Sequence, residues 1–144
     1  MAAPYDFRRI PPGVYGDRRP VEGEVVAVLH VRFEDRGLKL IETKSRAVRL
    51  HDIHELMTTD EDASPGGGAD RVRALAFFEV DRPGLIVSGD AVMVGGEPLG
   101  ALAGFDEAHM PNHMGVVVRT PSLDEPVVRV GDRVRFTPTL THAP

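Results

Sequence analysis

Turns that contain glycine and proline cut most of this chain into short apolar runs, and this punctuation limits the folds that it can adopt. The runs are rich in Val, Ile, Leu and Phe, and several of them alternate apolar with polar residues. Short runs of this kind between turn residues are typical of β-strands. We therefore expect strands within residues 22–33, 38–43, 47–50, 71–80, 85–105, 114–119 and 125–138.

The fold class predicted from these runs is mainly all-β, a small closed or nearly closed β-barrel. Many short strands joined by Gly/Pro turns favour a barrel or a sandwich, and a twisted sheet of about seven strands tends to close on itself. One segment departs from the pattern. Leu50, Ile53, Leu56 and Met57 recur at spacings of three and four residues, which predicts one short helical segment.

A length of 144 residues predicts a single domain. Residues 1–20 are rich in Pro, Gly and Arg without any period, so we expect an N-terminal arm there, a β-barrel domain over residues 21–138, and a C-terminal tail over residues 139–144. The chain contains no cysteine. Disulfides are therefore excluded, and a cytoplasmic location is expected.

Charge and hydropathy exclude two classes of partner. The formal net charge is −5 and there is no Trp, so we expect no nucleic acid partner. No run approaches the roughly 20 apolar residues of a membrane span, so no membrane partner is expected. The arginine pairs 8–9 and 18–19 are not followed by an apolar run, which argues against a secretory signal.

The loop "GFDEAHMPNHMG", residues 104–115, concentrates polar side chains between two predicted strands. Its candidates are Asp106, Glu107, His109, Asn112 and His113. Pro111 disfavours a regular helix between the two histidines, whereas a turn there would bring His109 and His113 to one point, with Asp106 or Glu107 adding a carboxylate. Two histidines and one carboxylate are a usual ligand set for zinc or non-haem iron. We therefore predict a divalent metal site in this loop.

A second histidine group occurs in "HDIHE", residues 51–55. His51 and His54 lie three residues apart, and Glu55 follows them. If folding brings this segment to the loop, His51 and His54 are candidate metal ligands, and the nearby acids can orient them or act as bases. Lys44 is a further catalytic candidate, as a nucleophilic amine or a charge that binds a carboxylate.

Two other interpretations of these residues stay open. In a structural one, Asp106 and Asn112 cap turns, His109 bonds to the backbone, and the histidines of 51–55 are solvated. In a catalytic one without metal, His109 and an adjacent acid transfer protons near neutral pH. Asn112 would orient a substrate or fix the loop in either catalytic version.

Three segments, "VEGEVVAVLH", "GLKLIETKSR" and "GFDEAHMPNH", resemble a family of short bacterial, chiefly actinobacterial, proteins that share a domain of unknown function. The resemblance covers residues 21–136, and its distinctive part is the loop motif GFDExHxPNH. It implies a small β-barrel, treats the loop residues as one unit, and associates the chain with specialised metabolism. It brings no established activity.

The sequence as a whole predicts a small cytosolic barrel protein with a His/carboxylate site that acts on a small metabolite. The reactions that fit are of lyase, cyclase, isomerase or hydrolase type. The alternative is a non-catalytic binding or accessory module that docks on a larger enzyme through its arm. A homodimer is plausible for either, because sheet edges and a Pro-rich arm favour exchange between protomers.

Overall fold

The computed structural model describes residues 15–139 of the chain. They form eleven strands, namely Val21–Phe33 (β1), Leu38–Lys39 (β2), Ser45–Val48 (β3), Ile53–Thr59 (β4), Gly68–Ala69 (β5), Val72–Arg82 (β6), Gly84–Val87 (β7), Ala91–Val94 (β8), Glu97–Asp106 (β9), Gly115–Arg119 (β10) and Arg133–Thr137 (β11). The all-β prediction is confirmed. No helix occurs in this part of the chain, and hence none that is long and apolar enough to cross a membrane.

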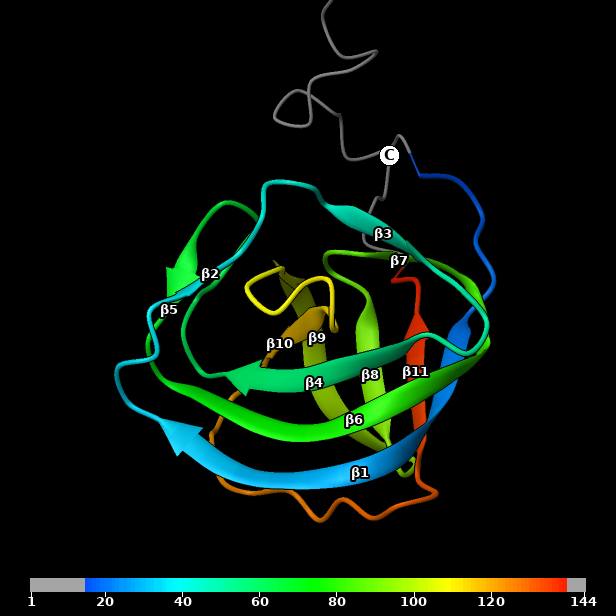
Figure 1. The fold of residues 1–144 in the computed structure, drawn as a ribbon. Helices are drawn as coiled ribbons and strands as arrows, with labels where there is room; N and C mark the ends of the chain where they lie inside the picture. Colours follow the sequence, from blue (N-terminus) through cyan, green and yellow to red (C-terminus); the bar gives the residue numbers. More distant parts are fainter. Residues whose placement is uncertain (1–14, 140–144) are drawn as a thin grey trace, which may run out of the picture.

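Seven of the strands close into a barrel in the order β1-β11-β8-β9-β10-β4-β6, as Figure 1 shows. All neighbours pair antiparallel except β4 and β10, which run parallel. The four remaining strands form two small pairs, β2 with β5 and β3 with β7, at the rim of the ring. The closed ring satisfies the backbone of every long strand.

The predicted helical segment over residues 50–57 is wrong, because residues 53–59 form strand β4. This strand pairs with β6 on one edge and with β10 on the other. Six consecutive residues from His54 to Thr59 are buried, so both faces of the strand are covered. A strand buried on both faces loses its alternation, and the helix-like spacing of its apolar residues was coincidental.

Two apolar clusters lie on opposite faces of the barrel wall. The larger includes Leu56, Phe78 and Phe136, and the smaller includes Leu40 and Met57. Leu56 and Met57 are consecutive in β4, and consecutive side chains of a strand point to opposite faces. The larger cluster therefore fills the barrel. The smaller one lies outside it, under a flap that consists of residues 36–42 and 63–70 with β2 and β5.

The described part of the predicted arm is bonded to the barrel. The Tyr15 hydroxyl donates to Ser45 Oγ, and Arg18 donates to both carboxylate oxygens of Asp90. Arg19 donates to the carbonyl of Pro83. The rest of the arm, residues 1–14 with its first arginine pair, lies outside the described residues, as do residues 140–144 of the tail.

Candidate metal centre

A row of paired residues across four neighbouring strands places the acidic side chains of the site on one face of the sheet. Phe77 of β6 pairs with Glu55 of β4, Glu55 with Gly115 of β10, and Gly115 with Asp106 of β9. Paired residues share a face of the sheet, so the two carboxylates flank a glycine on the outer face. A Cβ at Gly115 would lie 3.1 Å from both Asp106 Cβ and Met57 Sδ. The missing side chain leaves room for the two acids.

The loop after β9 folds back through a turn over residues 109–113. The carbonyl of His109 accepts hydrogen bonds from the backbone N–H groups of Asn112 and His113. This turn stacks the two imidazoles, whose ring centroids lie 5.0 Å apart with an angle of 24° between the planes. The local geometry expected for the loop is therefore present.

The two histidines meet a carboxylate from β4. Glu55, His109 and His113 each offer one ligand atom, and these three atoms lie within 4.8 Å of one another. We call these three residues the metal-competent group. His113 Nε2 and Glu55 Oε1 are 2.8 Å apart, and both side chains are nearly buried, with 12% and 11% of their surfaces exposed. The segments 51–55 and 104–115 are thus adjacent, and their meeting point is Glu55.

Two neighbours fix the ring of His113. Asn112 Nδ2 lies 2.6 Å from its Nδ1, and Phe77 meets the ring edge-on at a centroid distance of 5.0 Å. With the amide in this orientation Nδ1 accepts and Nε2 carries the proton toward Glu55. An amide rotated by half a turn would present its oxygen to a protonated Nδ1, which frees Nε2 for a metal. Asn112 can therefore support either tautomer.

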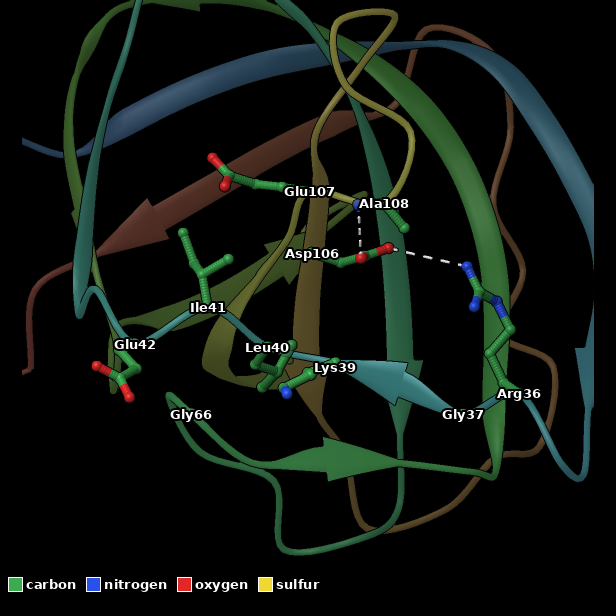
Figure 2. Close-up of a pocket in the computed structure, with 10 residues that line it drawn as sticks. All are labelled: Arg36, Gly37, Lys39, Leu40, Ile41, Glu42, Gly66, Asp106, Glu107 and Ala108. Carbon is green, nitrogen blue, oxygen red and sulfur yellow. Dashed lines mark hydrogen bonds and ion pairs between the residues drawn. The ribbon is translucent and has the colours of Figure 1, made fainter.

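Asp106 is buried beside this group with half of its carboxylate unused. Its Oδ1 accepts a hydrogen bond of 2.9 Å from the Ala108 N–H. Its Oδ2 has no hydrogen-bond partner among residues 15–139, although the side chain is only 3% exposed. Arg36 Nη2 lies 3.8 Å from that oxygen and 3.4 Å from His109 Nε2. Arg36 therefore links Asp106 to the metal-competent group, as Figure 2 shows for the Asp106 side.

The other candidates from the loop and from residue 44 have separate surroundings. Glu107 accepts from Arg46 at 2.5 Å and does not belong to the metal-competent group. Lys44 accepts a backbone hydrogen bond from Ser88 through its carbonyl, and its amine makes no hydrogen bond or ion pair with residues 15–139. The structure brings Asn112, His109 and His113 together with Asp106 nearby, and leaves Lys44 apart.

The histidines of residues 51–55 stand outside the metal-competent group. His54 follows the alternation of β4 onto the opposite face from Glu55, where its ring meets Phe78 edge-on at 5.9 Å. Burial lowers the pKa of His54, and this effect outweighs Asp52, which raises it from 3.6 Å away. His51 is exposed and pairs with Glu79 at 2.7 Å. Neither imidazole lies with Glu55, His109 and His113.

Two residues of the site were missed as site residues from the sequence. Glu55 was noted only as an acid next to His54, and the strand alternation that points it to the loop was hidden by the helix-like spacing. Arg36 lies in a turn and reaches Asp106 across 70 positions of sequence, so no local pattern reveals it. Both became visible only through the pairing of distant strands.

Comparison with known proteins identifies a family but no activity. A family model described as "Family of unknown function (DUF6917)" matches residues 15–137. Because this match covers most of the chain, the chain belongs to that family. No curated protein and no solved structure matches it.

Proposed function

We propose that this member of the DUF6917 family binds a divalent metal ion, zinc or iron, through Glu55, His109 and His113, and uses it on a small metabolite. One observation carries the proposal. A carboxylate that is 58 positions away in sequence from His113 lies with two imidazoles so that their ligand atoms are within 4.8 Å of one another. Imidazole and carboxylate side chains are the ligands that zinc and non-haem iron take in such sites.

The donor set fits such an ion. Two histidines and one carboxylate leave at least one coordination position for water or substrate. Ligand bonds of about 2.0–2.1 Å place tetrahedral donors about 3.3–3.4 Å apart, whereas Glu55 Oε1 and His113 Nε2 are 2.8 Å apart. The pair must therefore open by about half an ångström to admit the ion, which a rotation of the Glu55 side chain can supply.

The residues around the ligands suggest a division of roles. A bound divalent ion would act as a Lewis acid and make its water a stronger acid. Asn112 would hold His113 in the tautomer that ligation requires. Asp106 Oδ2 would hold or release a proton, because it is a free carboxylate oxygen at the edge of the site. Lyase, cyclase, isomerase and hydrolase reactions all use these elements.

A second candidate function is acid–base catalysis without metal. The hydrogen bond of 2.8 Å between His113 Nε2 and Glu55 Oε1 favours it, because a carboxylate that accepts from an imidazole tunes that imidazole as a base.

A docking module remains a further proposal, but Arg18 and Arg19 are engaged by the barrel. If the arm docks on a larger enzyme, the docking segment would therefore be residues 1–14. Cytoplasmic location, homodimerisation and a place in specialised metabolism stay predictions.

Elemental analysis tests the metal proposal. The full-length, untagged protein is dialysed against zinc and then against buffer, and its metal content is measured by inductively coupled plasma mass spectrometry. We expect about one equivalent in the wild type and in a His51→Ala control, whose imidazole lies at an exposed surface pair. Glu55→Gln and the His109→Ala/His113→Ala double variant should lose it, since they alter the proposed ligands themselves, and even the loss of a residue that only orients a ligand weakens metal binding by about 10- to 100-fold.

Circular dichroism and urea unfolding accompany each variant. The dialysis is repeated with iron and with manganese. A wild type that takes up none of the three metals would contradict the metal proposal and leave the acid–base pair. Variants that retain their full metal content would assign the ion to another place in the chain.

A further inference from the structure

We infer that the hollow beside the metal-competent group binds a small α-hydroxy or α-amino acid. Its carboxylate would be held by Arg36, with Lys39 adding positive charge from the lining, and its α-substituent would donate to Asp106 Oδ2. The inference rests on the proposed function only where it places this ligand next to the metal. The binding site itself stands on residues that are not among the three metal ligands.

The hollow lies between the flap and the start of the loop that follows β9, as Figure 2 shows. It has a volume of about 550 Å³, within the range of pockets that take small molecules. Its lining residues are 36, 37 and 39–42 of the flap, Gly66, and 106–108 of the loop. The walls therefore come from two separate parts of the chain that meet over the outer face of the barrel.

Two cations at this hollow have unused hydrogen-bonding capacity. The Arg36 guanidinium lies over the Phe33 ring at 5.7 Å from its centroid. Its Nη2 atom makes the polar contacts at 3.4 Å and 3.8 Å, and its Nε–H and Nη1–H groups have no hydrogen-bond partner among residues 15–139. Lys39 is exposed and its amine likewise has no partner in that part of the chain. A guanidinium with free N–H groups binds carboxylates in a bidentate manner. The ligand should therefore carry a carboxylate.

The buried Oδ2 atom of Asp106 is a hydrogen-bond acceptor that lacks a donor. Asp106 Oδ2 lacks any hydrogen bond from the described residues, and the residue is 3% exposed. A buried acceptor without a partner is costly, and a ligand that donates to it removes that cost. A hydroxyl or an ammonium group does so, whereas a second carboxylate would be repelled. The ligand should therefore carry a donor as well as its carboxylate.

The distance between the two recognition groups fixes where that donor is attached. Arg36 Nη2 and Asp106 Oδ2 lie only 3.8 Å apart. A small molecule contacts both groups most compactly when its carboxylate and its donor are on adjacent carbons, which is the arrangement of an α-hydroxy or α-amino acid. Ile41, a half-buried apolar residue of the lining, offers contact for the ligand's side chain. Because Arg36 also contacts His109, the carboxylate would lie beside the metal group.

A titration with matched acids tests this inference on the full-length protein. ¹H–¹⁵N NMR spectra follow the addition of L-lactate, L-malate, L-serine and L-aspartate, each with metal-free and with zinc-treated protein. Propionate matches lactate, 3-hydroxypropionate matches serine, and succinate matches malate and aspartate, each without the α-substituent. Lactamide is lactate without the carboxylate. We expect at least one of the four acids to bind with shifts at residues 36–42 and 106–108, and its control to bind at least about tenfold more weakly.

Variants then assign the contacts. Arg36→Gln, Lys39→Gln and Asp106→Asn should each weaken that acid at least about threefold, with the largest loss for Arg36→Gln. Arg49→Gln, an exposed arginine outside the hollow, should leave binding unchanged. Lys39 is exposed, so we expect its variant to keep the fold.

The inference is overturned if none of the four acids binds the wild type, or if Arg36→Gln and Lys39→Gln bind as tightly as the wild type. Its failure is separate from that of the proposed function. Acid binding by a protein that takes up no metal would support the hollow and refute the metal centre. Zinc uptake without acid binding would do the reverse.

Discussion

Asp90 and Asp106 are two aspartates with the same burial and opposite surroundings. Asp90 precedes β8 and is 2% exposed, while Asp106 ends β9 and is 3% exposed. Asp90 accepts from Arg18 through both oxygens, at 3.0 Å and 2.7 Å, and from the Val87 N–H at 2.9 Å. Asp106 accepts from one backbone N–H, and its second oxygen meets only a distant guanidinium.

The difference separates a carboxylate that stabilises the fold from one that is available to a ligand. Buried polar groups are almost always hydrogen-bonded, and an exception calls for an explanation. Both oxygens of Asp90 accept hydrogen bonds, and its charge ties the chain before β1 to the barrel. Asp106 keeps an oxygen free next to a hollow and a metal-competent group. We interpret the missing hydrogen bond as the place of a ligand.

Removing the partner of Asp90 should have the largest effect. Arg18→Met leaves a buried carboxylate without its cation, which costs about 3–5 kcal/mol of unfolding free energy. Urea unfolding at pH 7 measures it. Arg19→Met is the control, because Arg19 contacts only an exposed carbonyl and should cost less than about 1 kcal/mol. Equal losses of unfolding free energy in the two variants would contradict the structural role that we assign to Asp90.

Neutralising the two aspartates should give unequal results. Asp90→Asn weakens charge-assisted hydrogen bonds and should cost about 1.5–3 kcal/mol. Asp106→Asn keeps an oxygen for the Ala108 N–H and should change stability by less than about 1 kcal/mol. Urea unfolding of both variants compares them directly. A larger loss for Asp106→Asn would show that its free oxygen serves the fold rather than a ligand.

The sequence predicted the barrel and the loop, and it failed where distant strands decide the outcome. Regular turns between apolar runs predicted the ring, and Pro111 predicted that the loop is not helical. The helix predicted for residues 50–57 was wrong because β4 is buried on both faces and therefore lacks the usual alternation of a strand. The choice of Glu55 over His51 and His54 follows from its register with Gly115. No local pattern contains that register, so the third member of the group could not be predicted.

Substitution of Asn112 tests whether the loop that follows Asp106 orients a metal ligand. If its amide holds the His113 ring for ligation, Asn112→Ala should weaken zinc binding by about 10- to 100-fold. The fold should stay intact, because the side chain is exposed and touches only its neighbour. A competition titration against a chelator of known affinity measures the change. An unchanged zinc affinity would restrict Asn112 to the shape of the turn.

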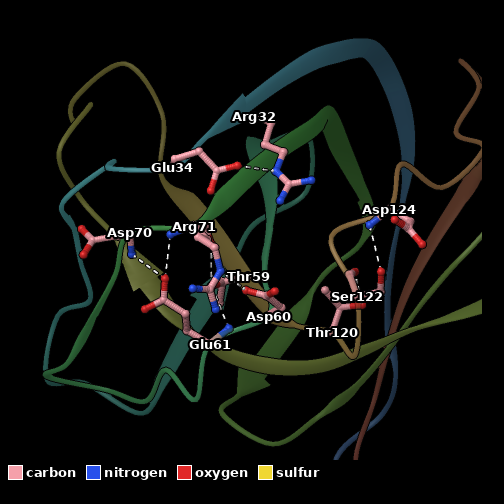
Figure 3. Close-up of polar contacts among 10 residues, drawn as sticks. All are labelled: Arg32, Glu34, Thr59, Asp60, Glu61, Asp70, Arg71, Thr120, Ser122 and Asp124. Carbon is pink, nitrogen blue, oxygen red and sulfur yellow. Dashed lines mark hydrogen bonds and ion pairs between the residues drawn. The ribbon is translucent and has the colours of Figure 1, made fainter.

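Glu61 extends the comparison to a surface carboxylate and should give the smallest effect. Its Oε2 accepts from the backbone N–H groups of Asp70 and Arg71, at 2.9 Å and 2.6 Å, as Figure 3 shows. The hydrogen bonds from Arg71 and then Asp70 lower the pKa of Glu61 below its ordinary value of 4.5. The stabilisation is therefore present above pH 4.5 and is lost as the pH falls through the lowered pKa.

Unfolding midpoints in urea at pH 7 and pH 3 check this expectation. Glu61→Gln should be slightly less stable than the wild type at pH 7 and nearly equal to it at pH 3. Glu42→Gln is a suitable control, because Glu42 is exposed and makes no ion pair with the described residues. An identical pH dependence of wild type and Glu61→Gln would contradict the proposed stabilisation by the hydrogen bonds of Glu61.

Anomalous diffraction at the zinc edge tests the central claim most directly, on crystals of the full chain grown with zinc. The account predicts one strong peak within bonding distance of Glu55, His109 and His113, with the Glu55–His113 hydrogen bond opened to admit it. Two exposed pairs, His51 with Glu79 and His30 with Glu125, are natural competitors for adventitious zinc. Peaks at those pairs alone, with the Glu55–His113 hydrogen bond intact, would contradict the metal centre.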